Sequence, residues 1–406
     1  MRVTIITFAM VLLLGIQLSA QAKFKVLRNF GSGTDGNVPA GPLRLDSRGN
    51  LYGVTSGGPG LLSGVGLVFE LTPQKTGGWH ENILHVFTGG SGSAYPWGGI
   101  LFDTAGNLFG TAEGYGSYAV GGIFELSPTN SGWNFSMLYS QGAGPGVVFD
   151  KVGNLYGYIG GSFYGAVGEL SPGSGAWNYT QLYSFCPLYG CPDGYNMPAP
   201  PIWDGKGNLW GTTFQGGISQ SPCTAAFGCG VIFEMTPNGD GTWTYNVMHE
   251  FASSSTDGQS PIGGLVMDAA GNFYGSTWIG GAYNQGTIFE FSYTGGQWVE
   301  TVLYDFPDCA QGCMVEGTLA RDKAGNLYGT AAGGNGNCAG YTCGVVFKLA
   351  PQKGGTWKYS VLANFTPTTG GFQPFHGVIL DSSGNLFGVT SGFGKYGFGT
   401  AFEITP

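Results

Sequence analysis

Short apolar runs of strand length recur along the chain in one fixed order, and Gly, Pro and Asn separate them. In each complete repeat the first run ends in an aspartate, as in residues 99–103 and 264–268. The second run carries the motif N-[LF]-[YFW]-G, and the third reads G-x-[VIA]-F-[EK]-[LMFI]-[TSA]-P in most copies. The fourth begins with tryptophan and ends in an aromatic residue, as in residues 79–87 and 243–251. Such alternating or wholly apolar runs, bounded by turn residues, predict four β-strands per repeat.

The element D-x-x-G-N joins the first two strands of every repeat, and its length never varies. It starts at Asp46, Asp103, Asp150, Asp204, Asp268, Asp322 and Asp381. Aspartate suits the first position of a type I turn and glycine supplies the left-handed residue that follows, so we predict a tight hairpin. Successive copies lie 57, 47, 54, 64, 54 and 59 residues apart. That period fits a small antiparallel sheet with its loops.

The two ends of the chain share one repeat. The last copy stops at residues 402–406, after its third strand, and has no fourth. Residues 26–30 (VLRNF) match residues 361–365 (VLANF), the end of a fourth strand, so the N-terminal strand is expected to complete the last sheet. A ring closed in this way leaves only short edges. We predict an all-β, seven-bladed β-propeller of four-stranded antiparallel blades, with an open solenoid as the alternative.

An N-terminal segment precedes the repeats. This segment has the pattern of a secretory signal peptide: Arg2, an apolar run from Val3 to about Leu18, and the small-residue site Ala20-Gln21-Ala22. We predict a signal peptide at residues 1–22 and a single propeller domain at residues 23–406. No other stretch of the sequence approaches the ~20 apolar residues of a spanning helix. The mature chain is therefore expected to lack a membrane span and to be secreted or periplasmic.

Composition narrows the class of protein further. Glycine accounts for 78 of 406 residues and aromatics for 15%, and because these recur at fixed places we expect a folded chain. Charged residues make up only 10%, and the net charge is −9. We do not expect the protein to bind nucleic acid, because a nucleic-acid-binding surface needs a basic stripe.

The paired motifs G-N-L-Y-G and G-x-V-F-E-L-T-P extend over nearly the whole mature chain. They resemble the Gloeo/Verruco (GloVer) tandem repeat of secreted bacterial proteins. The resemblance implies an exported repeat protein and supplies no catalytic residues. Members often end in a C-terminal anchor or sorting segment, whereas this chain ends at Pro406 without one, which favours release. The phrase D-x-x-G-N-L-Y is also similar to the repeats of NHL and lactonase-type propellers.

Eight cysteines fall into four close pairs: Cys186/Cys191, Cys223/Cys229, Cys309/Cys313 and Cys338/Cys343. Two pairs lie in loops of the fourth repeat, and the other two lie in the same loops of the sixth. In an exported chain an even count predicts disulfides, and a four-thiolate zinc site is the alternative. A bridge between two loops would stabilise the fold by roughly 4 kcal/mol, and one within a pair by about 2 kcal/mol. The connectivity stays open.

Acidic residues are mostly tied to the repeat. Seven of the 24 are turn aspartates and six more share one position of the third strand, so structural roles are expected for these. Off-pattern candidates for a catalytic site are Glu113, Glu316 and His376, the last entering a first strand near the ring axis. The catalytic residues stay unknown. We expect no metal or other cofactor, since D-x-x-G-N alone supplies too few oxygens for calcium.

Aromatic residues outside the repeated positions are the candidate binding residues. Six tryptophans begin fourth strands and are predicted wedges between blades. The cysteine loops are expected to lie on one face of the ring. The candidates lie in or beside loops expected on that same face, and they are Tyr95, Trp97, Tyr115, Tyr118, Trp278 and Tyr283. Flat amphipathic rings suit sugar faces, and packing between blades is their alternative role. We predict a monomeric binding module for a glycan or an extracellular protein partner; the rival is a polysaccharide- or lactone-acting hydrolase or lyase at the central channel.

Overall fold

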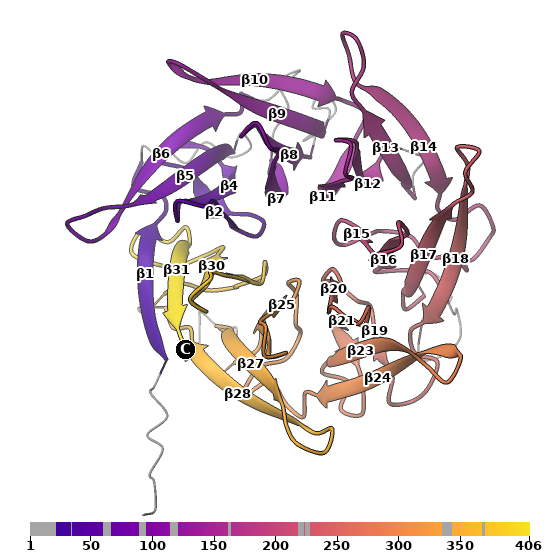
Figure 1. Ribbon diagram of the computed structural model, residues 1–406. Coiled ribbons are helices and arrows are strands. Elements are labelled where there is room, and N and C mark those ends of the chain that lie inside the picture. Colours follow the sequence, from indigo (N-terminus) through magenta and orange to yellow (C-terminus); the bar gives the residue numbers. More distant parts are fainter. Residues whose placement is uncertain are drawn as a thin grey trace, which may run out of the picture.

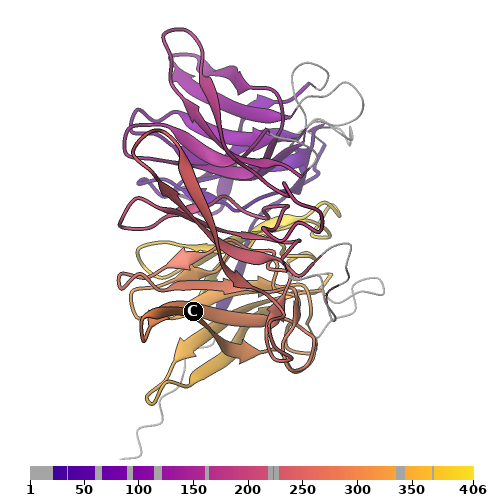
Figure 2. The same ribbon diagram turned by 90° about the vertical axis from the view of Figure 1, so that its right-hand side faces the viewer.

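The computed structural model describes residues 22–33, 35–59, 66–88, 95–113, 121–160, 164–217, 223, 228–334, 343–367 and 370–406. Within them the strands form seven antiparallel blades arranged in a ring (Figure 1), which confirms the predicted seven-bladed propeller. Seen from its side, the ring is a flattened disc (Figure 2). The predicted signal peptide lies outside the described residues except for Ala22. In the described part of the chain, no helix is long and apolar enough to cross a membrane.

Each blade runs from an innermost strand at the ring axis to an outer strand at the rim. The innermost strands are β3 (Arg44–Leu45), β7 (Pro96–Phe102), β11 (Ala143–Phe149), β15 (Ile202–Trp203), β20 (Val266–Met267), β25 (Ala320–Arg321) and β29 (Val378–Leu380). The second strands are β4 (Leu51–Gly57), β8 (Leu108–Ala112), β12 (Leu155–Ile159), β16 (Leu209–Thr213), β21 (Phe273–Ser276), β26 (Leu327–Ala331) and β30 (Leu386–Thr390).

The outer half of each blade holds the third and fourth strands. The third strands are β5 (Leu67–Pro73), β9 (Gly122–Thr129), β13 (Ala166–Ser171), β17 (Val231–Pro237), β23 (Thr287–Thr294), β27 (Val345–Pro351) and β31 (Thr400–Thr405). The fourth are β6 (Trp79–Val86), β10 (Gly132–Tyr139), β14 (Asn178–Ser184), β18 (Trp243–Glu250), β24 (Gln297–Asp305), β28 (Trp357–Asn364) and β1 (Lys23–Asn29). Three short strands in the described residues are additional to the blades. β2 (Asn37–Pro39) pairs with β4, and β19 (Gly258–Gln259) pairs with β22 (Ile279–Gly280).

The N-terminal strand closes the ring as the sequence predicts. β1 pairs antiparallel with β31, from Lys23 opposite Thr405 to Asn29 opposite Thr400, and so completes blade 7 in the order β1-β31-β30-β29. In Figure 1 the indigo β1 lies beside the yellow β31. Phe24 of this strand packs against Phe365 of blade 6, with ring centroids 5.7 Å apart. The two ends of the chain are therefore joined through one sheet.

The D-x-x-G-N element forms the predicted hairpin, and the first copy shows how. The Asp46 Oδ1 accepts hydrogen bonds from the backbone N–H groups of Arg48 and Asn50, both at 2.8 Å, and Oδ2 accepts one from the Asn50 amide at 2.9 Å. Gly49 has φ +86°, a conformation that favours glycine. Because the aspartate oxygens are used within their own turn, this carboxylate holds the hairpin rather than a ligand.

Tryptophans at the start of the outer strands pack between blades, as predicted. Trp243 of blade 4 lies 6.1 Å from Tyr156 of blade 3, and Trp298 of blade 5 lies 4.8 Å from Trp210 of blade 4, measured between ring centroids. In each pair a second-strand aromatic meets the tryptophan of the next blade. Burial of these rings between blades stabilises the ring as a whole.

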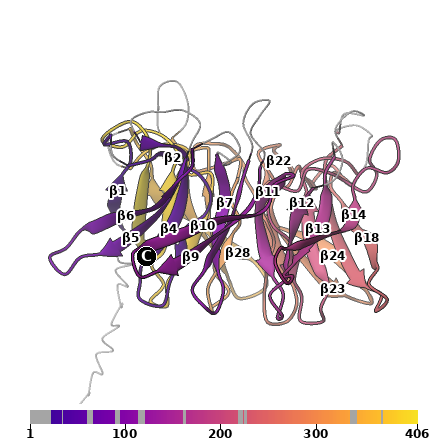
Figure 3. The ribbon, with the colours of Figure 1, turned by 90° about the horizontal axis from the view of Figure 1, so that it is seen from above.

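Strand order defines two faces of the disc. We call the face where second strands end and third strands begin the loop face, and the face of the D-x-x-G-N hairpins the turn face. The short strands β2 and β22 lie toward the loop face (Figure 3). The same face carries the start of each innermost strand, so residues just before or at that start belong to the loop-face end of the ring axis.

Candidate functional site

A cavity of about 720 Å³ lies on the ring axis. All seven blades contribute to its walls, through the innermost strand or through the residues just before it. The lining is mostly apolar, and its ionisable or aromatic polar side chains are Arg44, Trp97, Glu316, Arg321 and His376. A volume of roughly 300–1,000 Å³ with a few polar groups is typical of small-molecule sites. The channel of the propeller is therefore the candidate site.

Glycines let neighbouring innermost strands approach closely around this channel. Gly98 has φ +89°, and a Cβ placed on it would lie 2.6 Å from the carbonyl carbon of Pro145 in the next blade. Gly317 has the same role between blades 6 and 7, where an added Cβ would lie 2.6 Å from the carbonyl carbon of His376. Real Cβ atoms do not approach backbone so closely, so both positions need glycine. The channel wall is consequently built from backbone in tight contact.

Two aromatic side chains meet at the loop-face mouth of the channel. Trp97 lies near the start of β7 in blade 2 and is 41% exposed. Its ring is 5.7 Å from that of His376, centroid to centroid, at an interplanar angle of 86°. Because His376 precedes β29 of blade 7, the pair reaches past blade 1 across the mouth. A partly exposed tryptophan beside a histidine is thus presented to any ligand entering the channel.

His376 is neutral at physiological pH. Burial lowers the pKa of its imidazole well below the ordinary value, although the ring is not fully closed off from solvent. A neutral imidazole has one N–H donor and one acceptor nitrogen. It can therefore recognise hydroxyl groups.

Glu316 supplies a carboxyl group whose charge changes near neutral pH. Burial raises its pKa from the ordinary 4.5 to about 7. The indole N–H of Trp278 lies close enough to lower this pKa in part, but the two groups do not reach hydrogen-bond geometry. The mouth therefore combines Trp97, a neutral imidazole and a carboxyl group, with a second tryptophan beside that carboxyl group. The four residues come from four different blades.

The two arginines of the cavity differ in what holds them. Arg321 forms an ion pair with Asp268 at 3.7 Å, and its guanidinium lies 5.4 Å from the ring centroid of Tyr274. Arg44 is exposed and forms no ion pair with any residue that the structure describes. Arg321 is committed to the contact between blades, whereas Arg44 is the guanidinium open to the channel.

The structure separates the predicted binding residues into groups. Trp97 lines the cavity, and Trp278 lies beside the lining residue Glu316. Tyr283 is 58% exposed and does not line the cavity, while Tyr95 has φ +53° and its carbonyl accepts the Glu113 N–H at 2.9 Å. Glu113 is exposed and is absent from the cavity wall. The other two predicted residues, Tyr115 and Tyr118, lie outside the described residues.

Among the described residues, disulfides join the cysteines within three of the close pairs. The bridges are Cys186–Cys191, Cys223–Cys229 and Cys309–Cys313. Cys343 is also disulfide-bonded, and Cys338 lies outside the described residues. Of the two connectivities that the sequence leaves open, the structure has the local one, so each bridge stabilises by about 2 kcal/mol. Disulfides indicate an oxidising compartment such as the periplasm or the cell exterior.

The pKa of Glu316 predicts a pH-dependent stability. A carboxyl group whose folded-state pKa is raised contributes stability at low pH, and this contribution is lost as pH rises through about 7. Between pH 5 and pH 8 the free energy of unfolding of the wild type is therefore expected to fall by about 2 kcal/mol more than that of Glu316→Gln. This figure allows for screening of the carboxylate by solvent in the channel. Urea unfolding at both pH values measures this difference. Equal losses in the two proteins would contradict a raised pKa.

Several cavity residues were missed from the sequence. Arg44 and Thr318 line the channel but stand inside or beside predicted first strands, with no motif around them. The signal that could find them is position, because the residues just before and at the first strand of each repeat face the axis.

Comparison with known proteins supports the repeat assignment. The Gloeobacter/Verrucomicrobia repeat matches residues 15–222 and again residues 222–406. No curated protein matches the chain.

Solved structures with a similar fold are distant in sequence. A protein of unknown function from Dyadobacter fermentans DSM 18053 is 10% identical with a TM-score of 0.47, covering 95% of this chain and 99% of that one. A hypothetical selenium-binding protein from Sulfolobus tokodaii is 13% identical with a TM-score of 0.49, covering 80% and 78%. A luciferin-regenerating enzyme is 11% identical with a TM-score of 0.42, covering 95% of each chain. Values this low carry no inference about activity.

Proposed function

The chain belongs to the Gloeobacter/Verrucomicrobia repeat family, and from its channel mouth we propose that it is an exported binding propeller that holds a sugar residue of a glycan against Trp97. The observation that carries the proposal is the 41% exposed Trp97 ring at the mouth of an axial cavity of about 720 Å³. Tryptophan rings pack well against the C–H faces of sugars while their N–H groups bind polar atoms.

Polar groups around Trp97 support a sugar over a purely apolar ligand. The neutral His376 imidazole and the Thr318 hydroxyl face the same cavity, and both can bind hydroxyl groups. Glu316 adds an acceptor when it is ionised. A few polar groups that converge on an apolar cavity fix the orientation of a ligand.

Catalysis is the second candidate, because Glu316 has a pKa of about 7, a value suited to a general acid or base. Glycoside hydrolysis usually uses two carboxylates about 5–10 Å apart. Among the described residues that line the cavity, Glu316 is the one carboxylate. This favours binding over a two-carboxylate hydrolase and leaves a lyase or lactone hydrolase as the enzymatic alternative.

Replacing Trp97 tests the binding proposal. On a glycan array the mature wild-type chain is expected to bind at least one oligosaccharide, and Trp97→Ala is expected to bind it at least tenfold more weakly, because the sugar loses its aromatic platform. Titration calorimetry with that oligosaccharide measures the ratio.

Tyr283→Ala is the matched control, since Tyr283 is 58% exposed yet stands outside the cavity wall. It is expected to bind like the wild type. An array with no bound glycan, or unchanged affinity in Trp97→Ala, would overturn the proposal. Turnover of the bound oligosaccharide that is lost in Glu316→Gln would instead establish the enzymatic alternative.

A further inference from the structure

One pair of positions recurs at the contacts between neighbouring outer strands. Both positions are defined by their partners in the third strand, around its dipeptide [FG]-[EK]. The first position lies on one outer strand, opposite the residue just before this dipeptide. The second lies on the next outer strand, opposite the residue just after the dipeptide. At four contacts the pair is two stacked rings, with centroids 4.0–4.9 Å apart: His85–Phe135, Tyr139–Tyr179, Tyr183–Tyr245 and Tyr304–Tyr359. Aromatic stacking is therefore the usual way in which this position joins two blades.

The contact between blades 7 and 1 replaces the rings with an ionic cluster. Arg28 takes the first position and Glu81 takes the second. Asp35 lies five residues after Phe30, the aromatic residue that ends the fourth-strand run. The Arg28 guanidinium lies 2.7 Å from Asp35 Oδ2 and 2.6 Å from Glu81 Oε2. One cation thus bridges two carboxylates that are almost completely buried, with exposed side-chain fractions of 2% and 4%.

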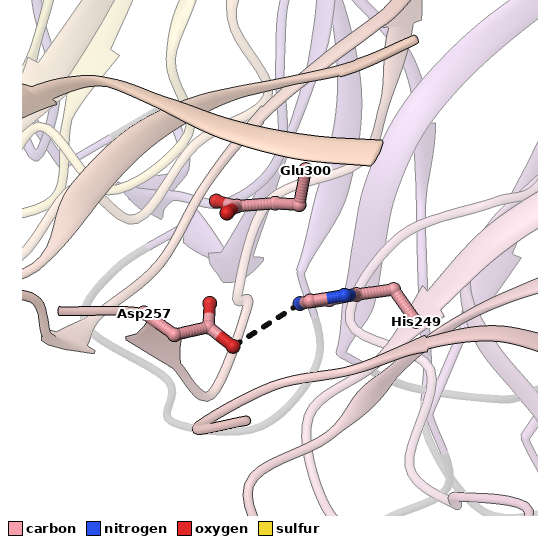
Figure 4. A group of neighbouring side chains, drawn as sticks. All are labelled: His249, Asp257 and Glu300. Carbon is pink, nitrogen blue, oxygen red and sulfur yellow. Dashed lines mark ion pairs between the residues drawn. The ribbon is translucent and has the colours of Figure 1, made fainter. Parts of the chain in front are cut away.

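The contact between blades 4 and 5 has a similar arrangement, with a histidine in place of the arginine. His249 takes the place of Arg28, and Glu300 takes that of Glu81. Asp257 lies six residues after Phe251, one more than separates Asp35 from Phe30. The three side chains converge from β18, the following loop and β24 (Figure 4), with ligand atoms within 4.8 Å of one another. His249 Nε2 lies 3.2 Å from Asp257 Oδ2. Between the described residues His249 and Glu300 no ion pair forms, so the histidine does not bridge the two carboxylates.

Three atoms of this cluster are buried without a hydrogen-bond partner among the described residues: His249 Nε2, Asp257 Oδ1 and Glu300 Oε1. The Asp257 side chain is 3% exposed. Its Oδ2 already accepts hydrogen bonds from the Ser253 N–H and hydroxyl at 2.9 and 2.8 Å, while Oδ1 is directed toward the Glu300 carboxylate (Figure 4). Leaving such groups unpaired in a low-dielectric interior costs about 1–3 kcal/mol each, and more when they are charged. The site therefore lacks a cation that the equivalent site between blades 7 and 1 has.

We propose that His249, Asp257 and Glu300 bind a divalent transition-metal ion of the Zn²⁺ class between blades 4 and 5. One imidazole nitrogen and two carboxylates form a common ligand set for zinc, with water filling the fourth position. Zinc–ligand distances of about 2.0–2.2 Å place tetrahedral ligands roughly 3.4 Å apart, so binding draws the carboxylates inward by about 1 Å. The expectation of no metal was made from the turn aspartates, and the proposed site lies at a different place in the chain.

Two further features of the site fit an ion of the zinc class. Three protein ligands are too few for Ca²⁺, which takes six to eight oxygens. Phe251 packs its ring against His249, with centroids 4.9 Å apart and an interplanar angle of 87°, and so fixes the imidazole from the side. The metal ties the outer strands of two blades together, which is the role of the stacked rings at four of the other contacts.

Zinc titration of the mature chain, first treated with EDTA and kept non-reducing so that the disulfides stay closed, tests the proposal. Calorimetry is expected to show one Zn²⁺ bound per chain with micromolar or tighter affinity, together with a rise of several degrees in Tm. Ca²⁺ at the same concentrations is expected to leave Tm unchanged. His249→Ala and Glu300→Gln are each expected to weaken zinc binding at least tenfold.

His249→Arg is the decisive variant, because it rebuilds the cluster found at Arg28, Asp35 and Glu81. It is expected to fold, with a Tm at or above that of the metal-free wild type, and to lose the response to Zn²⁺. His80→Ala removes an exposed histidine of another outer strand and is expected to bind zinc normally. No zinc binding by the wild type, or binding that survives in His249→Arg, would overturn the proposal.

Discussion

Removing residues 23–30 is expected to abolish cooperative folding of the chain. These residues supply β1, which covers the edge of β31, and they bury Leu27 and Phe30, which are 8% and 0% exposed. They also carry Phe24, which packs on Phe402, and Arg28, which bridges two buried carboxylates. Burial of a large apolar side chain is worth about 1.5–3 kcal/mol, so the loss exceeds about 5 kcal/mol before the carboxylates are counted. That is comparable to the whole stability of a typical domain, roughly 5–15 kcal/mol.

Urea unfolding followed by near-ultraviolet circular dichroism measures this loss. The matched control is a circular permutant that joins Pro406 to Lys23 through a short Gly-Ser linker and opens the chain between Gly295 and Gly296, in an exposed hairpin. Lys23 pairs with Thr405, so the linker has only a short gap to span. The permutant keeps β1 and is expected to unfold cooperatively near the wild-type midpoint. A truncated chain that unfolds as cooperatively as the permutant would contradict ring closure by β1.

Gly317→Ala is expected to destabilise the protein by about 3 kcal/mol and to distort the channel mouth. The new methyl group would meet the backbone nitrogen and Cα of Gly377 and lie 2.6 Å from the His376 carbonyl carbon. Backbone of the neighbouring blade cannot rotate away as a side chain can, so overpacking here is expensive. Because His376 and Glu316 flank this contact, glycan affinity should fall together with stability.

Gly205→Ala is the control for this substitution. Gly205 lies in a D-x-x-G-N turn, and an added Cβ there meets nothing within 4 Å. The change is expected to be neutral or to stabilise by up to about 1 kcal/mol, since alanine restricts the unfolded chain. Thermal and urea unfolding of the two variants compare the same chemical change at an open and a closed position. Equal stabilities would show that the innermost strands are not in tight contact.

The ring could be predicted from the sequence because every element is repeated. A single apolar run leaves strand and helix ambiguous, but the same four runs with the same hairpin seven times do not. The turn aspartates illustrate this: Asp46 makes the hydrogen bonds that its position in the motif predicts. Closure by residues 26–30 was also readable, because the match to residues 361–365 is a property of sequence alone.

The channel mouth could be predicted only in part. Trp97 stood out because it breaks the repeated tryptophan position, but its contact with His376 depends on which blades meet across the axis. Tyr283 stood out in the same way and lies away from the cavity. An aromatic residue outside the repeated positions is therefore a candidate binding residue. The curvature of the ring then decides which of these residues meet at the channel mouth.

The cluster between blades 4 and 5 had a signal that reading single residues did not reveal. Taken alone, His249 is a residue of a predicted outer strand, and that position predicts a structural role. Comparing equivalent positions of the repeats shows that Glu81 and Glu300 stand where other repeats have aromatic rings, and that each has a basic partner in the preceding outer strand. Buried charge at a position that is usually aromatic needs compensation, and this indicates either an ion pair or a metal.

A crystal structure of the mature chain with the tightest-binding oligosaccharide from the array is the most direct test of the proposed binding site. We expect a sugar ring stacked on Trp97 at the loop-face mouth, with hydroxyl groups within hydrogen-bond distance of His376 or Glu316. An oligosaccharide bound at the rim or on the turn face, with the channel mouth unoccupied, would contradict it.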